Sequence, residues 1–401
     1  MTTRRLGAAL ALCLVLGGAA TAQQQDAWQG ADFATLQAAA DQGTVQAQVA
    51  LAQRLEAGEG VLQNYALAAE WYARAAGQGS AAAANRLGQY YFAGLGVEQS
   101  RATALQWLGT AAATGEAQFL YDYGAALEAG PDGDPAAAAA AYEKAAALGH
   151  PEAQVSLGVL FQNGSGVPKD LARAKELYEG PAEAGLARAQ NNLGLLYVRG
   201  EGIPQDYDRA FALLEAAAGQ GLPVAIRNLG VMYENGFGVV ADETVAHDLY
   251  RRAALAAEAP GAEGGVPTAV YDPRLLPPDT SEEGLKRLQN GLRAGDPLAL
   301  FTAGWLLTQE EGAGYPELRQ AAAFFHAAAQ AGSPAAMTNL GLMYFEGRVV
   351  PQDFAVGYMW LVLAGTAGFG EARDLGARFA EQMTPGQIAE GQTLAERWAG
   401  R

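Results

Sequence analysis

Residues able to do acid–base or metal chemistry are sparse in this sequence. The three histidines, His150, His247 and His326, are far apart, and no pair has the spacing that places two metal ligands on one helix face. Adjacent acids such as Glu282–Glu283 and Glu310–Glu311 are more typical of helix starts and loops than of a glycosidase carboxylate pair. The pattern predicts no catalytic residues, no metal site and no cofactor, so we expect a protein that is not an enzyme.

Glycine pairs of the form Gly-x-Gly recur, for example at Gly164–Gly166 and Gly236–Gly238. They do not indicate a nucleotide site, because that fingerprint follows a strand and these pairs join two expected helices. The chain has 26 Lys and Arg against 43 Asp and Glu, a net charge of −17. This acidity disfavours binding to nucleic acid, which requires a basic surface, and to anionic lipid.

The first 22 residues predict export from the cytoplasm. Arg4–Arg5 precede an apolar stretch, Leu6–Leu16, and Ala20–Ala22 form a small-x-small site for cleavage after Ala22. The only cysteine, Cys13, leaves with this segment, so the mature chain has neither a disulfide nor a thiolate metal ligand. Loss of the two arginines gives the mature chain a net charge of −19. We expect a periplasmic or secreted protein that does not span a membrane after cleavage.

One motif dominates the chain, and it indicates tandem repeats. A Leu-Gly pair or a close variant recurs eight times, and its second positions are 36, 36, 34, 36, 36, 74 and 37 residues apart. The interval of 74 is one repeat plus an insertion. A second series of glycines keeps the same interval. Two markers with one period predict a repeat array in place of two or three globular domains. The second positions are Ala52, Gly88, Gly124, Gly158, Gly194, Gly230, Gly304 and Gly341.

Each repeat is expected to be a helix, a loop, a second helix and a turn. In residues 187–222, apolar residues at i, i+4, i+7 and i+8 from Ala189 form one stripe of the first helix. Gly200 and Gly202 end that helix and turn the chain. Asp206 is placed to cap the second helix. Small residues such as Gly194 let the two helices approach closely.

This pattern resembles the Sel-one-like repeat (SLR) family, a branch of the tetratricopeptide-type α-solenoids. The string Leu-Gly-x-x-Tyr-x-x-Gly-x-Gly-Val-x-x-Asp-x-x-x-Ala-x-x-x-Tyr is matched well by residues 157–178 and 229–250. The resemblance covers about 45–257 and 298–370. It implies an all-α fold, a right-handed α-solenoid of about eight helix-loop-helix repeats of 34–37 residues with one Pro/Gly-rich insertion.

The rest of the chain divides around these repeats. Residues 23–44 are expected to hold an N-terminal capping helix and 45–257 repeats one to six. Residues 258–281 contain five prolines and are expected to be a linker or surface loop, or alternatively a partner-docking loop around Tyr271 to Pro278. A capping box at Thr280 and Glu283 then opens the segment 282–370, a helix followed by repeats seven and eight. Residues 371–401 are expected to form capping helices, one of which begins with a capping box at Thr384.

The predicted partner-contact residues come from three groups. First-helix positions that the repeat does not specify are candidates. So is the recurrent asparagine before Leu-Gly, which either holds a peptide backbone or ties adjacent repeats together. The third group is the insertion. The candidates are Gln154, Gln190, Arg227 and Thr338, then Asn192, Asn228 and Asn339, and finally Tyr271.

Aromatic residues recur once per repeat on each expected helix, for example Tyr197 on the first and Tyr178 on the second. A stripe at helical spacing is typical of core, and the alternative is a groove that stacks sugars. Stacked repeats leave a long surface suited to extended partners. The resemblance implies an adaptor or regulator of an envelope or signalling complex, bound to envelope or membrane-associated protein. The alternative is a polysaccharide- or peptidoglycan-binding envelope protein.

Overall fold

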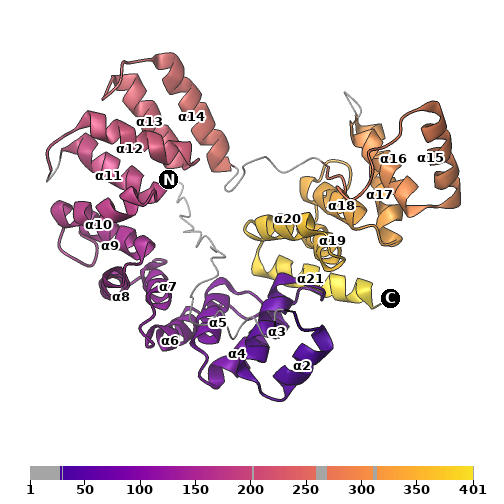
Figure 1. The fold of residues 1–401 in the computed structure, drawn as a ribbon, viewed down its shortest axis with the longest axis horizontal. Helices are drawn as coiled ribbons and strands as arrows, with labels where there is room; N and C mark the ends of the chain where they lie inside the picture. Colours follow the sequence, from indigo (N-terminus) through magenta and orange to yellow (C-terminus); the bar gives the residue numbers. More distant parts are fainter. Residues whose placement is uncertain (1–27, 29, 201–202, 259–268, 310–313, 401) are drawn as a thin grey trace. The chain divides into compact units, whose positions relative to one another are not determined.

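The computed structural model describes residues 28, 30–200, 203–258, 269–309 and 314–400. Within these residues the chain forms twenty helices and no strand, and helices adjacent in sequence pack in pairs (Figure 1). This confirms the all-α repeat fold, a right-handed α-solenoid of helix pairs. The predicted signal segment 1–22, the acids Glu310–Glu311 and part of the predicted insertion lie outside the described residues. No helix in the described part of the chain combines the length and the apolar character needed to cross a membrane.

The helices of the eight repeats follow one another as pairs, with α2 before repeat one, α15 before repeat seven, and α20 and α21 after repeat eight. Their bounds are α2 Phe33–Asp41; α3 Val45–Ala57 and α4 Tyr65–Gly77; α5 Ala81–Ala93 and α6 Arg101–Ala112; α7 Ala117–Glu128 and α8 Pro135–Ala147; α9 Pro151–Asn163 and α10 Leu171–Glu183; α11 Ala187–Arg199 and α12 Tyr207–Gly219; α13 Pro223–Asn235 and α14 Glu243–Glu258; α15 Glu282–Ala294; α16 Pro297–Gln309 and α17 Tyr315–Gln330; α18 Pro334–Glu346 and α19 Phe354–Thr366; α20 Gly370–Ala380; and α21 Pro385–Ala399.

The loop inside a repeat is shaped by its two glycines and one aspartate. In repeat four, Gly164 ends α9 in the left-handed conformation. Gly166 lies so close to the previous repeat that a Cβ there would overlap the main chain at Pro135. Asp170 then caps α10 by accepting the Arg173 N–H at 3.0 Å. The predicted cap at Asp206 is confirmed, since it accepts the N–H of Arg209 at 3.0 Å.

The chain divides into two compact units, and each is described by itself. Among the described residues, the first unit contains 79–92, 100–200 and 203–258, and the second contains 28, 30–78, 93–99, 269–309 and 314–400. The second unit therefore brings the first repeat together with repeats seven and eight. This grouping cannot be inferred from the order of the repeats along the chain.

The core of the first unit is built where the second helix of a repeat covers the glycine of its first helix. Tyr142 and Tyr178 are buried, and their rings lie over Gly124 and Gly158. A Cβ on Gly158 would be 2.5 Å from Cε1 of Tyr178. Tyr142 and Tyr178 are therefore packing residues of the core, as expected for a stripe at helical spacing.

The core of the second unit surrounds α17, α18 and α19, and α21 covers it. Phe325 and Trp360 are buried, and the ring of Trp398 on α21 packs edge-on to Trp360 with centroids 4.8 Å apart. The turn before α4 joins this core, because Tyr358 Oη donates to Gln63 at 2.5 Å. Repeat eight thus contacts the first repeat within this unit.

Two predicted helix starts have different outcomes. The capping box at Thr384 is confirmed, with Gln387 as its partner at N3. The box predicted at Thr280 is wrong by one residue: Ser281 caps α15 and accepts the N–H of Gly284 at 3.1 Å. A serine hydroxyl caps as well as a threonine, so the sequence offered two adjacent candidates, and the backbone places Ser281 at the start of α15.

Candidate functional site

One position of the first helix, directly before the Leu-Gly pair, contains the predicted asparagines Asn192, Asn228 and Asn339. Aspartate stands there in repeat three, as Asp122. The structure shows that these side chains do different things in the two units, and that the residue facing them from the preceding repeat decides which.

In the first unit this position ties neighbouring repeats together. Asn228 Nδ2 on α13 donates to Asn191 Oδ1 on α11 at 2.8 Å, and Asn191 Nδ2 donates to Asn192 Oδ1 at 3.1 Å. Asn85 Nδ2 on α5 donates in the same way to Asp122 Oδ2 on α7 at 2.7 Å. Sequence reasoning missed Asn85 and Asn191, although both stand at the same place, three residues before the helix glycine.

In the second unit the same position binds main chain. Asn339 Oδ1 accepts the N–H of Val270 at 2.6 Å, and Asn339 Nδ2 donates to the carbonyl of Val270 at 2.9 Å. Asn339 is 1% exposed and Val270 is 3% exposed. A side-chain amide that pairs with both polar groups of one residue recognises an extended backbone whatever side chain that residue carries.

Asn228 and Asn339 face different residues in the repeat before them. Three residues before the glycine of repeat seven stands Phe301, at the place that Asn191 occupies in repeat five. A phenyl ring cannot accept the amide hydrogen bond that Asn191 accepts from Asn228. Phe301 packs instead near Tyr271, with ring centroids 5.6 Å apart. The side-chain amide of Asn339 is satisfied instead by the main chain of Val270.

The segment on Asn339 is held by side chains as well. The Tyr271 ring lies 5.1 Å from the Trp305 ring. Asp272 is buried and pairs with Arg274, whose Nη2 is 2.7 Å from its Oδ2. The hydrogen bonds from Arg274 lower the pKa of Asp272. The Arg274 guanidinium also lies over the Phe369 ring, 5.7 Å from its centroid. The part of the predicted insertion from Val270 to Arg274 therefore contacts repeats seven and eight.

Three of the predicted partner-contact residues form hydrogen bonds within the repeat array, and their side chains are buried or half-buried. Gln190 is buried; its Nε2 donates to the carbonyl of Ala182 at 3.2 Å, and its Oε1 accepts from Gln220 at 2.9 Å. Gln154 reaches back to its preceding helix similarly. Thr338 is fully buried and donates to a carbonyl of its own helix. Arg227, by contrast, is exposed.

A chain of polar side chains runs through repeats two to four of the first unit, from the buried Asn85 and Asp122 to the half-buried His150. Burial raises the pKa of Asp122, and hydrogen bonds from Asn85, Gln118 and Gln89 act in the opposite direction. Gln118 Nε2 donates to Asp122 Oδ1 at 2.9 Å, and Gln118 Oε1 lies 3.1 Å from Nε2 of His150. His150 Nδ1 accepts the N–H of Ala153 and so caps α9. Each member of the chain has a structural partner.

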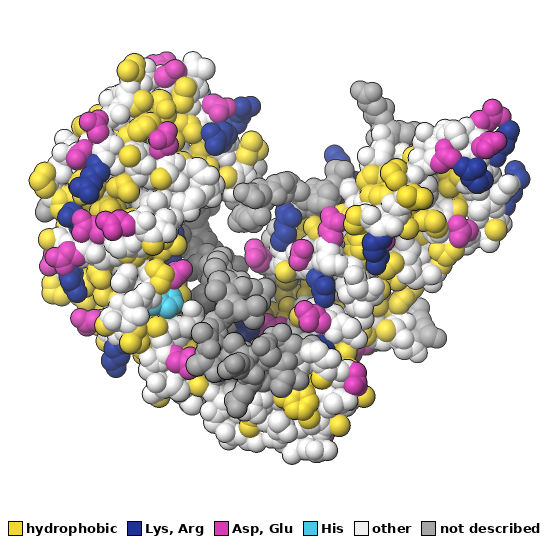
Figure 2. Space-filling view, in the orientation of Figure 1, with side chains coloured by type: hydrophobic (Ala, Val, Ile, Leu, Met, Phe, Trp, Pro, Cys, Tyr) yellow, Lys and Arg dark blue, Asp and Glu magenta, His cyan; other side chains and the backbone are white. Residues whose placement is uncertain are grey.

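The other histidines and acids do not converge. His247 and His326 are exposed, and among the described residues no group of three His, Cys, Asp or Glu side chains is placed to hold a metal ion. On the face of the molecule shown in Figure 2, acidic and basic side chains are interspersed and do not form one basic patch.

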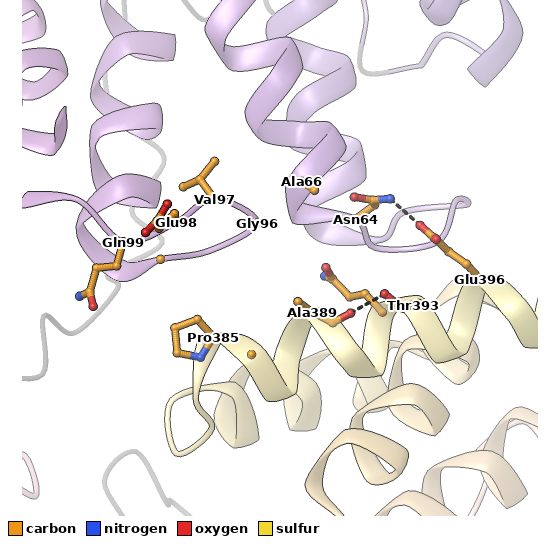
Figure 3. A pocket seen from close by; sticks show the side chains of 13 residues that line it. Asn64, Ala66, Gly96, Val97, Glu98, Gln99, Pro385, Ala389, Thr393 and Glu396 are labelled. Atoms are coloured by element: carbon orange, nitrogen blue, oxygen red, sulfur yellow. Dashed lines mark hydrogen bonds between the residues drawn. The ribbon is translucent and has the colours of Figure 1, made fainter.

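A cavity of about 500 Å³ lies in the second unit, where α21 crosses the start of α4 and the loop 94–99 (Figure 3). Asn64 Nδ2 donates to Glu396 Oε1 at 2.5 Å across it, and Gln392 Oε1 accepts the N–H of Tyr65 at 3.2 Å. Pro385 faces the same loop at the start of α21. The cavity is bordered by a contact that joins the C-terminal helix to the first repeat, and its walls bring together no nucleophile and base.

Comparison with known proteins identifies the repeat. The family model of the Sel1 repeat matches eight segments, residues 45–80, 81–116, 117–150, 151–180, 187–222, 223–257, 298–333 and 334–369. No curated protein matches the chain in sequence.

Two crystal structures are similar to this one. The c5321 protein, a protective antigen of uropathogenic Escherichia coli with an SLR fold, has 25% identity and a TM-score of 0.50 over 91% of this chain and 86% of its own. A Sel1 repeat protein from Oxalobacter formigenes has 30% identity and a TM-score of 0.49 over 53% of this chain and 86% of its own. With eight matched repeats over most of its length, this chain belongs to the Sel1 repeat family.

Proposed function

We propose that this protein is an exported adaptor that binds a protein partner in a complex of the bacterial envelope. Sel1 repeat proteins are generally scaffolds for protein–protein interaction, and their fold is typically non-catalytic. The observation that carries the proposal is the pair of hydrogen bonds from Asn339 to the backbone of Val270. It supports the idea that a first-helix face of this array accommodates an extended polypeptide.

Export is part of the proposal and rests on the sequence of residues 1–22. We expect the mature chain to begin at Gln23 and to be recovered from the periplasm or the medium. N-terminal sequencing and cell fractionation test this directly. Replacement of Arg4 and Arg5 by glutamate is expected to retain the chain in the cytoplasm. An intact N-terminus in the cytoplasmic fraction of the unaltered chain would contradict export.

The partner is tested by cross-linking inside the cell. A photoreactive residue at the exposed Arg227, on a first helix, is expected to capture one envelope protein, which mass spectrometry then identifies. The matched control is the same residue at Arg251, which is 74% exposed on the second helix of the same repeat. Capture from both positions alike would contradict a first-helix binding face.

The same experiment separates the alternative, a glycan-binding envelope protein. That alternative depends on aromatic side chains exposed in a groove, and Trp71, Tyr178 and Trp360 are buried. One sample is treated with glycan-degrading enzymes before the cross-linked material is isolated. A protein recovered with and without treatment supports the adaptor. Recovery only while the glycan is intact contradicts it.

A further inference from the structure

Residues 270–276 lie on repeats seven and eight in the way that a bound peptide would lie. We propose that this segment is a built-in occupant of a peptide-binding site on α16 and α18, and that a partner segment of similar chemistry displaces it. The chemistry is a short segment with an aliphatic residue, then an aromatic residue, then an aspartate at which the chain turns, since the carbonyl of Asp272 accepts the N–H of Leu275 at 3.0 Å. The proposal rests on the proposed function, because it names what the adaptor recognises.

The first argument is the main-chain contact. Asn339 and Val270 exchange two hydrogen bonds at 2.6 and 2.9 Å, and both residues are buried. Both contacts on the Val270 side are backbone atoms, so any extended residue could make them. If the segment left with nothing in its place, the buried amide of Asn339 would lose both partners, which is costly. The site therefore favours exchange of one occupant for another over an empty state.

The second argument is the pair of side-chain positions. The Val270 side chain joins the apolar core of the second unit, which sets the preference for an aliphatic residue. Tyr271 lies against Phe301 and Trp305, with ring centroids 5.6 and 5.1 Å apart, which sets the preference for an aromatic residue next. Aromatic contacts of this kind add affinity beyond the area that they bury.

The third argument is how little of the segment is buried. Val270 and Asp272 are buried, but Pro273 and Arg274 are exposed and Leu276 is 88% exposed. So small a contact is weak for a separate molecule. It is effective here because a tethered segment acts at a local concentration on the order of millimolar. A partner with more contacts at the same positions can therefore compete.

The fourth argument is that the first unit lacks this arrangement. Asn228 stands at the same repeat position as Asn339, and its amide donates to Asn191 of the neighbouring first helix. The place of Asn191 is taken in repeat seven by Phe301. Because Phe301 cannot accept a hydrogen bond from Asn339, the Asn339 amide binds the main chain of Val270. The ring of Phe301 also contacts the ring of Tyr271. Asn228 is therefore the matched control for Asn339.

The test uses a fluorescent peptide with the sequence of residues 267–277 as the probe. The full chain is prepared unaltered and as an open variant, in which residues 269–276 are replaced by eight glycine and serine residues. We expect the peptide to bind the open variant at least about tenfold more tightly than the unaltered chain. Asn339→Ala in the open variant is expected to lower the affinity about tenfold, and Asn228→Ala to leave it unchanged. Alanine in place of the tyrosine of the peptide weakens binding to the open variant.

Absence of peptide binding to a folded open variant, as judged by circular dichroism and melting, overturns the proposal. An equal effect of Asn339→Ala and Asn228→Ala overturns it as well. If the open variant does not fold, the unaltered chain with Tyr271→Ala takes its place. There the weakened segment is expected to admit the peptide and to raise hydrogen exchange at Val270, and no change in either measurement counts against the proposal. If the cross-link from Arg227 persists while the peptide fails, the adaptor function stands and only this inference fails.

Discussion

Gly158 on α9 and Tyr178 on α10 set the distance between the two helices of repeat four, since a Cβ on Gly158 would be 2.5 Å from Cε1 of the buried tyrosine. Gly158→Ala is expected to lower the free energy of unfolding by about 1–2 kcal/mol through overpacking, despite the better helix propensity of alanine. Urea unfolding measures this. The matched control is the exposed Gly219→Ala on α12, where a Cβ meets nothing within 4 Å and stability is expected to rise by about 0.5–1 kcal/mol. Stabilisation by both changes would contradict the close contact.

The Asn228–Asn191 hydrogen bond is expected to couple repeats five and six. Asn228→Ala leaves the side-chain amide oxygen of Asn191 without this donor. We expect the free energy of unfolding to fall by about 1 kcal/mol and hydrogen exchange in α11 and α13 to become faster. Asn235→Ala is the control, because that exposed side chain bonds only within its own helix. The control is expected to change stability by less than about 0.5 kcal/mol. Equal rates of hydrogen exchange in the Asn228→Ala and Asn235→Ala variants would show that this hydrogen bond does not couple repeats five and six.

Stability is expected to depend on pH through Asp122. Because burial raises its pKa in the folded protein, the folded state holds the proton more tightly than the unfolded state does. This contribution is present below the ordinary carboxyl pKa and is lost as pH rises through the raised value. Asp122→Asn is expected to reduce the dependence of the free energy of unfolding on pH over that range. Urea titrations at several pH values measure this. Asp132→Asn, at an exposed aspartate, serves as the control. If the free energy of unfolding of Asp122→Asn still depends on pH as it does in the unaltered chain, another group is responsible for that dependence.

The contribution of His150 to stability is expected to depend on pH in the opposite direction to that of Asp122. Burial lowers its pKa, so its contribution is present above the ordinary histidine pKa and is lost as pH falls through the lowered value. Protonation of Nδ1 also ends the cap on the N–H of Ala153. His150→Ser keeps a capping oxygen without a titration in this range, and we expect the pH dependence on the acid side of neutrality to shrink. Melting temperatures between pH 7 and 5 check this against the exposed His247→Ser.

Gln392 is expected to hold α21 on the first repeat. Its Oε1 accepts the N–H of Tyr65 at 3.2 Å, and the side chain is 6% exposed. Gln392→Ala is expected to lower the stability of the second unit by about 1–3 kcal/mol, because a backbone N–H loses its partner. Limited proteolysis and melting measure the effect. The exposed Gln382→Ala is the comparison, and the same loss there would point to a general effect of glutamine on this end of the chain.

The repeats, their register and most of their helix ends could be predicted from the amino-acid sequence. A period near 36 residues and apolar residues at helical spacing predict helix pairs, because each pair must bury the same stripe against its neighbours. Caps such as Asp206 and Thr384 could be predicted for a local reason: the side-chain acceptor and the free N–H are three residues apart in any helix start. The position of the recurrent asparagines was also visible in the sequence.

The hydrogen-bond partners of those asparagines could not be predicted from the sequence and are seen only in the folded protein. Asn228 and Asn339 are identical in repeat position, and the difference between them comes from residues 37 or more positions earlier, an asparagine in one case and Phe301 with Val270 in the other. The contact of α21 with Tyr65 spans a much longer range, 327 residues along the chain. Local spacing carries no information about such pairs, because the hydrogen bond forms only after the stacking of repeats has brought the two segments together.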